Sequence, residues 1–511
     1  MNWLLNFIEH KSYFPQVQNA EREQQKAAVL RIFLGIIILI RFTEITYSLN
    51  IYYDSGTYKW ASVYIITLII SFTIGFFSPI TTFLLLCSLH WFDILAGTFN
   101  LGTVVLIFTL LLLILINQGY YYSVDNLILK GNSFLSKSLK SVYNLIGNPS
   151  KSDITKVYIF GFILYASISF GALLYHVSDT YWLGGITIKS LLTSSYLSKH
   201  YQFFRWLELS SPILFGIFSI AAGIFQSIFQ FLMLPLVFLK HGKKFVVLWG
   251  LSFVIMSLLF INLSYLPHVE LVFWLLVFFP VRSASEKHSM IHFSNYRKTP
   301  LKRFYTLYSL ILILFIFLCF PILGNRVCGS RVFKDSRLSN FPKYFKNGIV
   351  KIGLSIPDVF NKVDLSMGNH WMLLYRMNNN QQWELVPITA IDGSRINYLG
   401  CDILHFTNHN TDFLYFGSTL LYRRSILEVD NLTQFHEDKN QYGRNHIEQV
   451  ITYDYKYNKF KSSHLYKVQI CSSKSSEATL FESNAERHHT ELIYTKLWTF
   501  DGHILAEKIN D

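Results

Sequence analysis

Charged residues are scarce in this sequence. Only 15% of the 511 residues are Asp, Glu, Lys or Arg, whereas 51% are hydrophobic and the mean hydropathy is +0.31. Soluble domains usually carry about 25% charged residues, so the composition argues against a soluble enzyme, a disordered chain and a coiled coil. The apolar residues are concentrated before about residue 325, in blocks of membrane-spanning length. We therefore expect a polytopic α-helical membrane domain followed by a globular tail.

Cysteine is also rare, and the sequence shows no cysteine pattern typical of a metal site or a disulfide scaffold. The five cysteines form no CxxC pair and no zinc-ligand spacing. The net charge of +13 comes from Lys and Arg residues in the loops between apolar blocks. A nucleic-acid-binding face needs clustered Lys and Arg, so we expect no nucleic-acid partner. The first 20 residues lack the apolar core and cleavage site of a signal peptide.

The apolar blocks predict nine transmembrane helices. A hydrocarbon core ~30 Å thick needs about 20 apolar residues per helix. The block 211–239 is long enough for two short helices or for one helix bent near Pro235. Counting it as one helix puts the basic loops on a single side of the membrane. The predicted spans are 28–48, 60–77, 80–96, 102–118, 157–176, 211–239, 246–264, 266–281 and 303–323.

The charge asymmetry across these loops predicts the orientation. Seventeen Lys and Arg lie in one set of loops and their flanks, against four in the other set. Because cytoplasmic loops carry the excess of positive charge, we expect an integral membrane protein with its N-terminus in the cytoplasm. The predicted organisation is a cytoplasmic segment 1–27, a transmembrane domain 28–324 and an extracytoplasmic domain 325–511. The outer loop 177–210 is partly apolar, and it could re-enter the membrane or lie on its surface.

The tail predicts a small, mostly β, α+β domain. The sequence from 383 to 390 has the composition of a strand, and Asp392-Gly393 is a hairpin signal. Residues 445–460 carry both helical and alternating spacing, and we expect a helix that becomes a strand near Thr452. Two further strands are predicted at Tyr466–Cys471 and Leu492–Phe500.

Several short motifs resemble one family of membrane proteins. They are Phe99-Asn100-Leu101-Gly102 before the fourth span, Ser123-Val124-Asp125 after it, Trp182-Leu183-Gly184-Gly185 after the fifth, and His370-Trp371-Met372, Trp383 and Asp392-Gly393 in the tail. Together they resemble the horizontally transferred transmembrane (HTTM) domain proteins, which share the membrane body of vitamin K-dependent gamma-carboxylase. The resemblance implies a multi-pass body with an extracytoplasmic C-terminal domain. The positions that match the family motifs are Asn100, Ser123, Asp125, Trp182 and Gly185.

Two positions differ from the carboxylase where its chemistry resides. The family lysine that acts as a base shortly before Trp-x-x-Gly is absent between 172 and 182, and the family histidine near the fourth span is replaced by Gly102. We therefore predict an HTTM-type membrane protein without gamma-carboxylase activity, acting with a protein partner or a small secreted peptide on the outer side. One alternative is a membrane enzyme with altered chemistry that uses a reduced quinone-like lipid cofactor, and another is a transporter.

Two pairs of His and Asp residues are weak candidates for catalysis. His90 and Asp93 are three residues apart in the third span, and His176 and Asp179 repeat this spacing at the end of the fifth. A carboxylate at this distance along a helix can orient an imidazole and raise its basicity. The simpler interpretation of each pair is a solvated or interfacial helix end.

Other polar residues within the apolar blocks have structural and functional interpretations. Gln226 and Gln230 lie one helical turn apart, and they suit interhelical hydrogen bonds or a quinone-like ligand. Arg41 and Glu44 have the spacing of an ion pair in the first span. In the tail, a group of His and Asp residues matches no metal motif, and we expect no metal site there. These residues are His405, His409, Asp412, His488 and His489.

Overall fold

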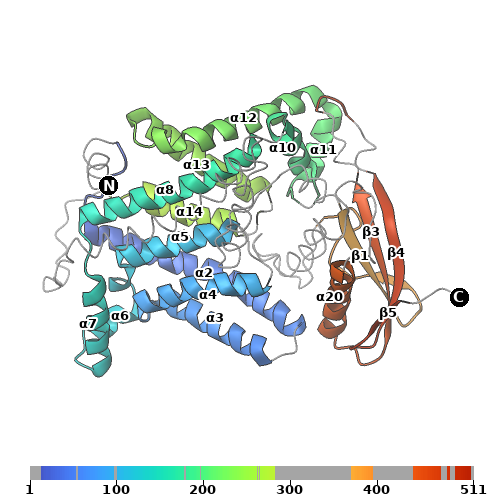
Figure 1. The fold of residues 1–511 in the computed structure, drawn as a ribbon, viewed down its shortest axis with the longest axis horizontal. Coiled ribbons are helices and arrows are strands. Elements are labelled where there is room, and N and C mark those ends of the chain that lie inside the picture. The colour runs from blue at the N-terminus through green and yellow to red at the C-terminus, as the bar shows by residue number, and fades with distance from the viewer. Residues whose placement is uncertain are drawn as a thin grey trace, which may run out of the picture.

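The structure of the protein is a computed structural model, which describes eleven segments of the chain. These are residues 13–52, 56–96, 101–177, 180–195, 197–261, 263, 265–281, 370–394, 441–473, 480–483 and 489–507. Two parts are seen, a helical domain and a β domain that lies at one end of it (Figure 1). We call the two ends of the helical domain sheet-proximal and sheet-distal.

Long helices lying side by side form the helical domain (Figure 1). They overlap the first eight predicted spans, and the ninth, 303–323, lies outside the described residues. The helices are α2 (Ala20–Tyr52), α3 (Gly56–Ile74), α4 (Ser78–Ala96), α5 (Leu101–Ile116), α8 (Lys151–His176), α12 (Pro212–Leu236), α13 (Lys240–Phe260) and α14 (Leu266–Phe278).

Three of the described helices are long and apolar enough to cross a membrane. They are the part of α8 from Lys151 to Phe170, α12 and α13. Shorter apolar stretches lie in α3, α4, α5 and α14. The structure therefore supports a membrane protein, but it does not support the predicted count of nine spans. Most of the block 211–239 forms a single helix, Pro212–Leu236, and Pro235 lies in its last turn.

The interior of the helical domain is closely packed. Trp274 of α14 lies against Gly250 of α13, where an added Cβ would come within 2.2 Å of the indole ring. Small residues allow neighbouring helices to approach in this way. The outer faces of α12 and α13 instead leave large apolar side chains exposed, as expected for helices that contact lipid. Examples are Ile217, Phe225, Phe231 and Leu248.

Shorter helices cover both ends of this domain. At the sheet-distal end lie η1 (Gln118–Tyr120), α6 (Val124–Leu129) and α7 (Phe134–Ile146). At the sheet-proximal end, the predicted outer loop contains three short helices between α8 and α12, two of which are labelled in Figure 1. They are α9 (Thr180–Leu183), α10 (Ile186–Thr193) and α11 (Tyr201–Ser210).

The β domain contains an antiparallel sheet of five strands in the order β2-β1-β3-β4-β5, with one helix packed on it. Ile447, Val450 and Ile451 of the helix contribute to the same core as Val468 and Trp498 of the sheet. The elements are β1 (His370–Met377), β2 (Trp383–Leu385), α20 (Gln441–Tyr457), β3 (His464–Ser473), β4 (Thr490–Phe500) and β5 (Leu505–Glu507).

The predicted strands at 466–471 and 492–500 are confirmed, and they lie within β3 and β4. The strand predicted at 383–390 is shorter, because β2 ends at Leu385, two residues before Pro387, whose ring nitrogen cannot donate to a sheet. The predicted change from helix to strand near Thr452 is wrong. The helix continues to Tyr457. The helical backbone directs the side chain of Asp454 toward the sheet, where Arg376 and Tyr466 donate hydrogen bonds to it.

Candidate functional site at the sheet-proximal end

His176 is the last residue of α8, and residues of two other helices hold its side chain. Its ring is stacked on Trp182 of α9, with centroids 3.6 Å apart and an interplanar angle of 4°. Its Nδ1 lies 3.1 Å from Oε1 of Gln230 in α12. The indole Nε1 of Trp182 donates a hydrogen bond to Oγ of Ser227, also in α12, at 3.2 Å. All four side chains are buried, so two residues singled out from the sequence, His176 and Gln230, meet in a packed contact that joins three helices.

We expect His176→Ala to lower the free energy of unfolding by roughly 1–3 kcal/mol, because the change removes the stacked ring and leaves a buried amide unpaired. The matched control is Val177→Ala, since Val177 is the next residue and is exposed, and this change should cost less than about 0.5 kcal/mol. Unfolding of the detergent-solubilised protein, followed by fluorescence, measures both. Equal stability of the two variants would show that the His176 contact contributes nothing.

Gly185 closes the turn that follows Trp182. Its φ is +77°, a conformation that costs little only for glycine. An added Cβ would come within 2.6 Å of the backbone nitrogen of Ile220 and 2.9 Å of the carbonyl carbon of Ser219, both in α12. The Trp-x-x-Gly motif therefore packs the loop against α12. The indole of Trp182 donates to Ser227, and Gly185, which has no side chain, allows its backbone to lie close to that of Ser219 and Ile220.

A buried lysine follows this turn. Nζ of Lys189 in α10 lies 3.0 Å from a carboxylate oxygen of Glu208 in α11, and the two side chains are 0% and 1% exposed. The same Nζ donates to the carbonyl oxygens of Leu480 and Glu482, each at 3.2 Å. The ammonium group of Lys189 therefore lies against one carboxylate and two carbonyl oxygens among the described residues. The contact fixes the tail segment 480–483 to the loop.

Asp392 makes a second connection between the loop and the β domain. Its backbone carbonyl accepts a hydrogen bond from Ser195 Oγ at 2.8 Å, and its carboxylate accepts from the hydroxyl of Tyr201. Ser394 donates to the other carboxylate oxygen through its backbone N–H at 3.0 Å and its hydroxyl at 2.7 Å. Burial alone would raise the pKa of Asp392, but these hydrogen bonds outweigh it and hold the pKa below its ordinary value.

The Ser-Val-Asp motif lies at the other end of the domain, where it stabilises a helix start. One carboxylate oxygen of Asp125 accepts from the backbone N–H of Phe77 at 2.6 Å. The other accepts from the N–H of Ser78 and from the hydroxyl of Tyr143, each at 2.7 Å. The acceptor thus satisfies free N–H groups at the start of α4. Ser123 Oγ accepts from the N–H of Asn126 and caps α6. Both motif residues have structural roles here.

The two glutamines of α12 bond to different neighbours. Gln230 contacts His176 of α8, as described above, and Oε1 of Gln226 accepts from Nε1 of Trp249 in α13 at 3.4 Å. Both contacts are interhelical hydrogen bonds, which are the structural role that these residues suggest from the sequence. They do not converge on one site.

The sequence analysis did not single out the buried carboxyl group of Glu270. Glu270 of α14 is buried, and its Oε1 accepts from the hydroxyl of Tyr165 in α8 at 3.0 Å. Its Oε2 has no hydrogen-bond partner among the residues that the structure describes. The signal was present in the sequence, because Glu270 is the one acidic residue of the apolar stretch 266–281, and a lone charge in such a stretch is a functional candidate.

Several residues predicted from the sequence lie beyond what the structure describes. The backbone of α4 includes His90 and Asp93, but their side chains are outside the described part, as is that of Glu44. Asn100 and Asp179 are outside the described residues altogether. Arg41 is described, and its guanidinium carbon lies 3.8 Å from the centre of the Tyr265 ring, a cation–π contact inside the domain.

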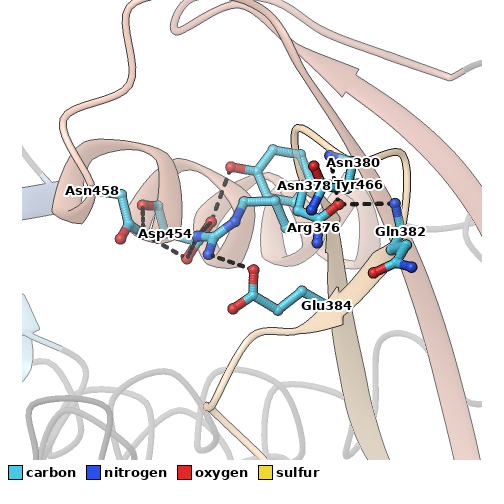
Figure 2. A network of polar contacts seen from close by, with 8 residues as sticks. All are labelled: Arg376, Asn378, Asn380, Gln382, Glu384, Asp454, Asn458 and Tyr466. Carbon is cyan, nitrogen blue, oxygen red and sulfur yellow. Dashed lines mark hydrogen bonds and ion pairs between the residues drawn. The ribbon is translucent and has the colours of Figure 1, made fainter.

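The β domain has a polar network of its own (Figure 2). Asp454 of α20 accepts two hydrogen bonds from one guanidinium nitrogen of Arg376, at 3.0 and 3.1 Å, and a third from the hydroxyl of Tyr466 at 3.0 Å. The second terminal guanidinium nitrogen reaches Glu384, at 3.4 Å. The network joins α20 to β1, β2 and β3. Its charged groups bond to one another, so we interpret its role as structural.

The described residues contain no group of three or more His, Cys, Asp or Glu side chains placed to hold a metal ion. Of the five tail residues considered for metal binding, His489 is described and exposed, and the others lie outside the described segments. Cys471 is a free thiol, and burial raises its pKa to about 11. Cys328 and Cys401 lie outside the described segments.

Comparison with known proteins yields no relative. No family model matches the chain, and no curated protein or solved structure matches it significantly.

Proposed function

We propose that the protein is a multi-pass membrane protein of the HTTM type that does not carboxylate glutamate. It acts on the extracytoplasmic side, where the loop 177–210 and the β domain together bind a protein partner or a small secreted peptide. Lys189, Ser195 and Tyr201 of the loop all contact the tail, which supports a single binding unit made from both.

The observation that carries this proposal is the state of Lys189. A carboxylase-like mechanism needs a base, and an amine acts as a base only through its unprotonated lone pair. Lys189 is the lysine that follows Trp182-x-x-Gly185, but its amine is paired with Glu208 and donates to two carbonyl oxygens. The carboxylate charge and the two carbonyl oxygens favour the ammonium form. The other nearby candidate, His176, is stacked and hydrogen-bonded within the fold.

We expect purified protein to form no gamma-carboxyglutamate when it is supplied with reduced vitamin K, carbon dioxide and a glutamate-containing peptide. The physical reason is that neither Lys189 nor His176 offers a free base at the outer end of the domain. Mass spectrometry of the peptide and of the quinone measures both products. Detection of carboxylated glutamate or of quinone epoxide would contradict the proposal.

The proposed topology has nine spans, with the N-terminus in the cytoplasm and the β domain outside. The separation of basic loops supports it, and so does the single helix at 212–236, since splitting that block would move the basic turn around Lys240 to the outer side. The exposed apolar faces of α12 and α13 are the surfaces expected to contact lipid.

We expect an impermeant maleimide on intact cells to label Asn379→Cys and to spare Asn132→Cys, in protein whose five native cysteines have been replaced. Both positions are exposed loop residues, so their intrinsic reactivity should be similar and the membrane alone should distinguish them. Permeabilised cells, in which both positions should react, provide the control. Labelling of position 132 but not 379 on intact cells would show that the topology is the reverse of the proposed one.

A second candidate function is a membrane enzyme with altered chemistry, and Glu270 is the observation that favours it. A carboxyl oxygen without a partner among the described residues, inside an apolar helix, is costly unless the group is protonated or a ligand contacts it. A reduced quinone-like lipid, whose ring carries hydroxyl groups, would offer a donor to satisfy it. Loss of bound lipid quinone in Glu270→Gln, measured by extraction from the purified protein, would separate this function from the first.

A further inference from the structure

The helix α7 lies across the sheet-distal end of the helical domain, roughly perpendicular to the long helices (Figure 1). Ser133 caps its start by accepting from the N–H of Ser136 at 3.2 Å. Leu139 and Tyr143 are fully buried and belong to a small core shared with Tyr120. Because the long helices run along the proposed membrane normal, α7 runs parallel to the proposed membrane surface.

The hairpin of α6 and α7 also exposes large apolar side chains. Phe134 is 82% exposed and Leu127 is 67% exposed, and Leu135 and Tyr122 are exposed beside them. On a helical wheel, Phe134 and Leu135 form a sector next to the buried one, separate from that of Lys137 and Lys140. An apolar sector, a core-facing sector and a basic sector on one helix are the pattern of an interfacial helix.

The charge of this region is almost entirely positive. The sequence from 119 to 156 contains five lysines and two aspartates. Asp125 is buried in the contact at the start of α4, and Asp153 accepts hydrogen bonds from Ser150 at the start of α8. Lys130, Lys137 and Lys140 form no ion pair with a residue that the structure describes. The first turns of α13 add further basic residues at the same end, namely Lys240, Lys243 and Lys244.

We propose that the α6–α7 hairpin is an anionic-lipid-binding element that lies in the headgroup region of the cytoplasmic leaflet. Phe134, Leu135 and Leu127 enter the acyl-chain boundary, and Lys130, Lys137 and Lys140 contact lipid phosphates. This inference rests on the proposed membrane topology. The occupant is a lipid surface because the hairpin contacts the turn between α3 and α4, where Ile74, Phe76 and Ile80 are also exposed. The exposed charge of Lys130, Lys137 and Lys140 adds attraction to anionic headgroups.

The test uses full-length protein with its native cysteines replaced, reconstituted into vesicles of phosphatidylcholine with or without phosphatidylglycerol. Single spin labels are placed at Phe134→Cys, at Asn144→Cys in the basic sector, and at Ile217→Cys on the exposed face of α12. Collision rates with oxygen and with a nickel chelate report depth. We expect the labels at 134 and 217 to favour oxygen and the label at 144 to favour nickel. Phosphatidylglycerol should deepen the label at 134, and replacing Lys130, Lys137 and Lys140 by glutamine should abolish that change.

The outcomes separate this inference from the topology on which it rests. If the label at 217 lies in lipid but that at 134 is aqueous, or is shielded from both reagents by protein, the lipid-binding element is refuted and the membrane body stands. If the label at 217 is aqueous as well, the membrane proposal itself fails. An unchanged response to phosphatidylglycerol in the glutamine variant would overturn the role of the lysines.

Discussion

Glu208→Ala is expected to lower the free energy of unfolding by about 3–5 kcal/mol, because it leaves the fully buried ammonium of Lys189 without its carboxylate. The carbonyl oxygens of Leu480 and Glu482, which also accept from Lys189, carry no net charge and cannot replace it. Since these carbonyls belong to the tail, the variant should also release the segment 480–483 from the loop. Thermal unfolding measures the first effect, and the rate of limited proteolysis near residue 480 measures the second.

A double variant provides the control for this prediction. Replacing both partners with apolar residues, as Lys189→Met with Glu208→Leu, removes both buried charges and should recover most of the lost stability. Proteolysis near residue 480 should remain fast, because the methionine cannot donate to the two carbonyl oxygens. If Glu208→Ala were as stable as the unchanged protein, the ion pair would contribute nothing to holding the loop and the tail together.

Hydropathy predicted the helical domain well at the level of helices and less well at the level of spans. The eight long helices lie where apolar blocks occur, because burial in lipid and burial in a helical bundle select the same residues. For that reason, composition alone does not distinguish a spanning helix from a short buried one such as α14, whose 13 residues include Glu270. The short helices α9 to α11 were not predicted individually, since each is shorter than the window over which periodicity can be recognised.

The sequence suggested polar pairs within one helix, and it suggested interhelical hydrogen bonds for Gln226 and Gln230 without indicating their partners. The spacing of His176 and Asp179 suggested a pair within one segment, but the described contact of His176 is with Gln230, 54 residues away. The same holds for Lys189, whose partners lie 19 and about 290 residues further along the chain. The spacing of residues within a short segment cannot reveal contacts between residues that lie far apart in the sequence.

The β domain offers a prediction with an internal control, since Arg376 pairs with one buried and one exposed carboxylate (Figure 2). Asp454 is 0% exposed, and Glu384 is 56% exposed. Asp454→Ala should cost about 3–5 kcal/mol, because it removes the buried carboxylate from the guanidinium and leaves the hydroxyl of Tyr466 without this acceptor. Glu384→Ala should cost less than about 1 kcal/mol, because water replaces the exposed carboxylate.

Chemical denaturation of the detergent-solubilised protein, monitored by the fluorescence of the β domain, tests the pair of variants. Trp498 is buried in the core that α20 shares with the sheet, so detachment of α20 should change its emission in Asp454→Ala and leave it unchanged in Glu384→Ala. Asp454→Asn should fall between them, because the amide oxygen still accepts a hydrogen bond from Arg376 but no longer compensates its charge. Equal losses for Asp454→Ala and Glu384→Ala would mean that burial does not govern this network, and that α20 is held to the sheet by its apolar face alone.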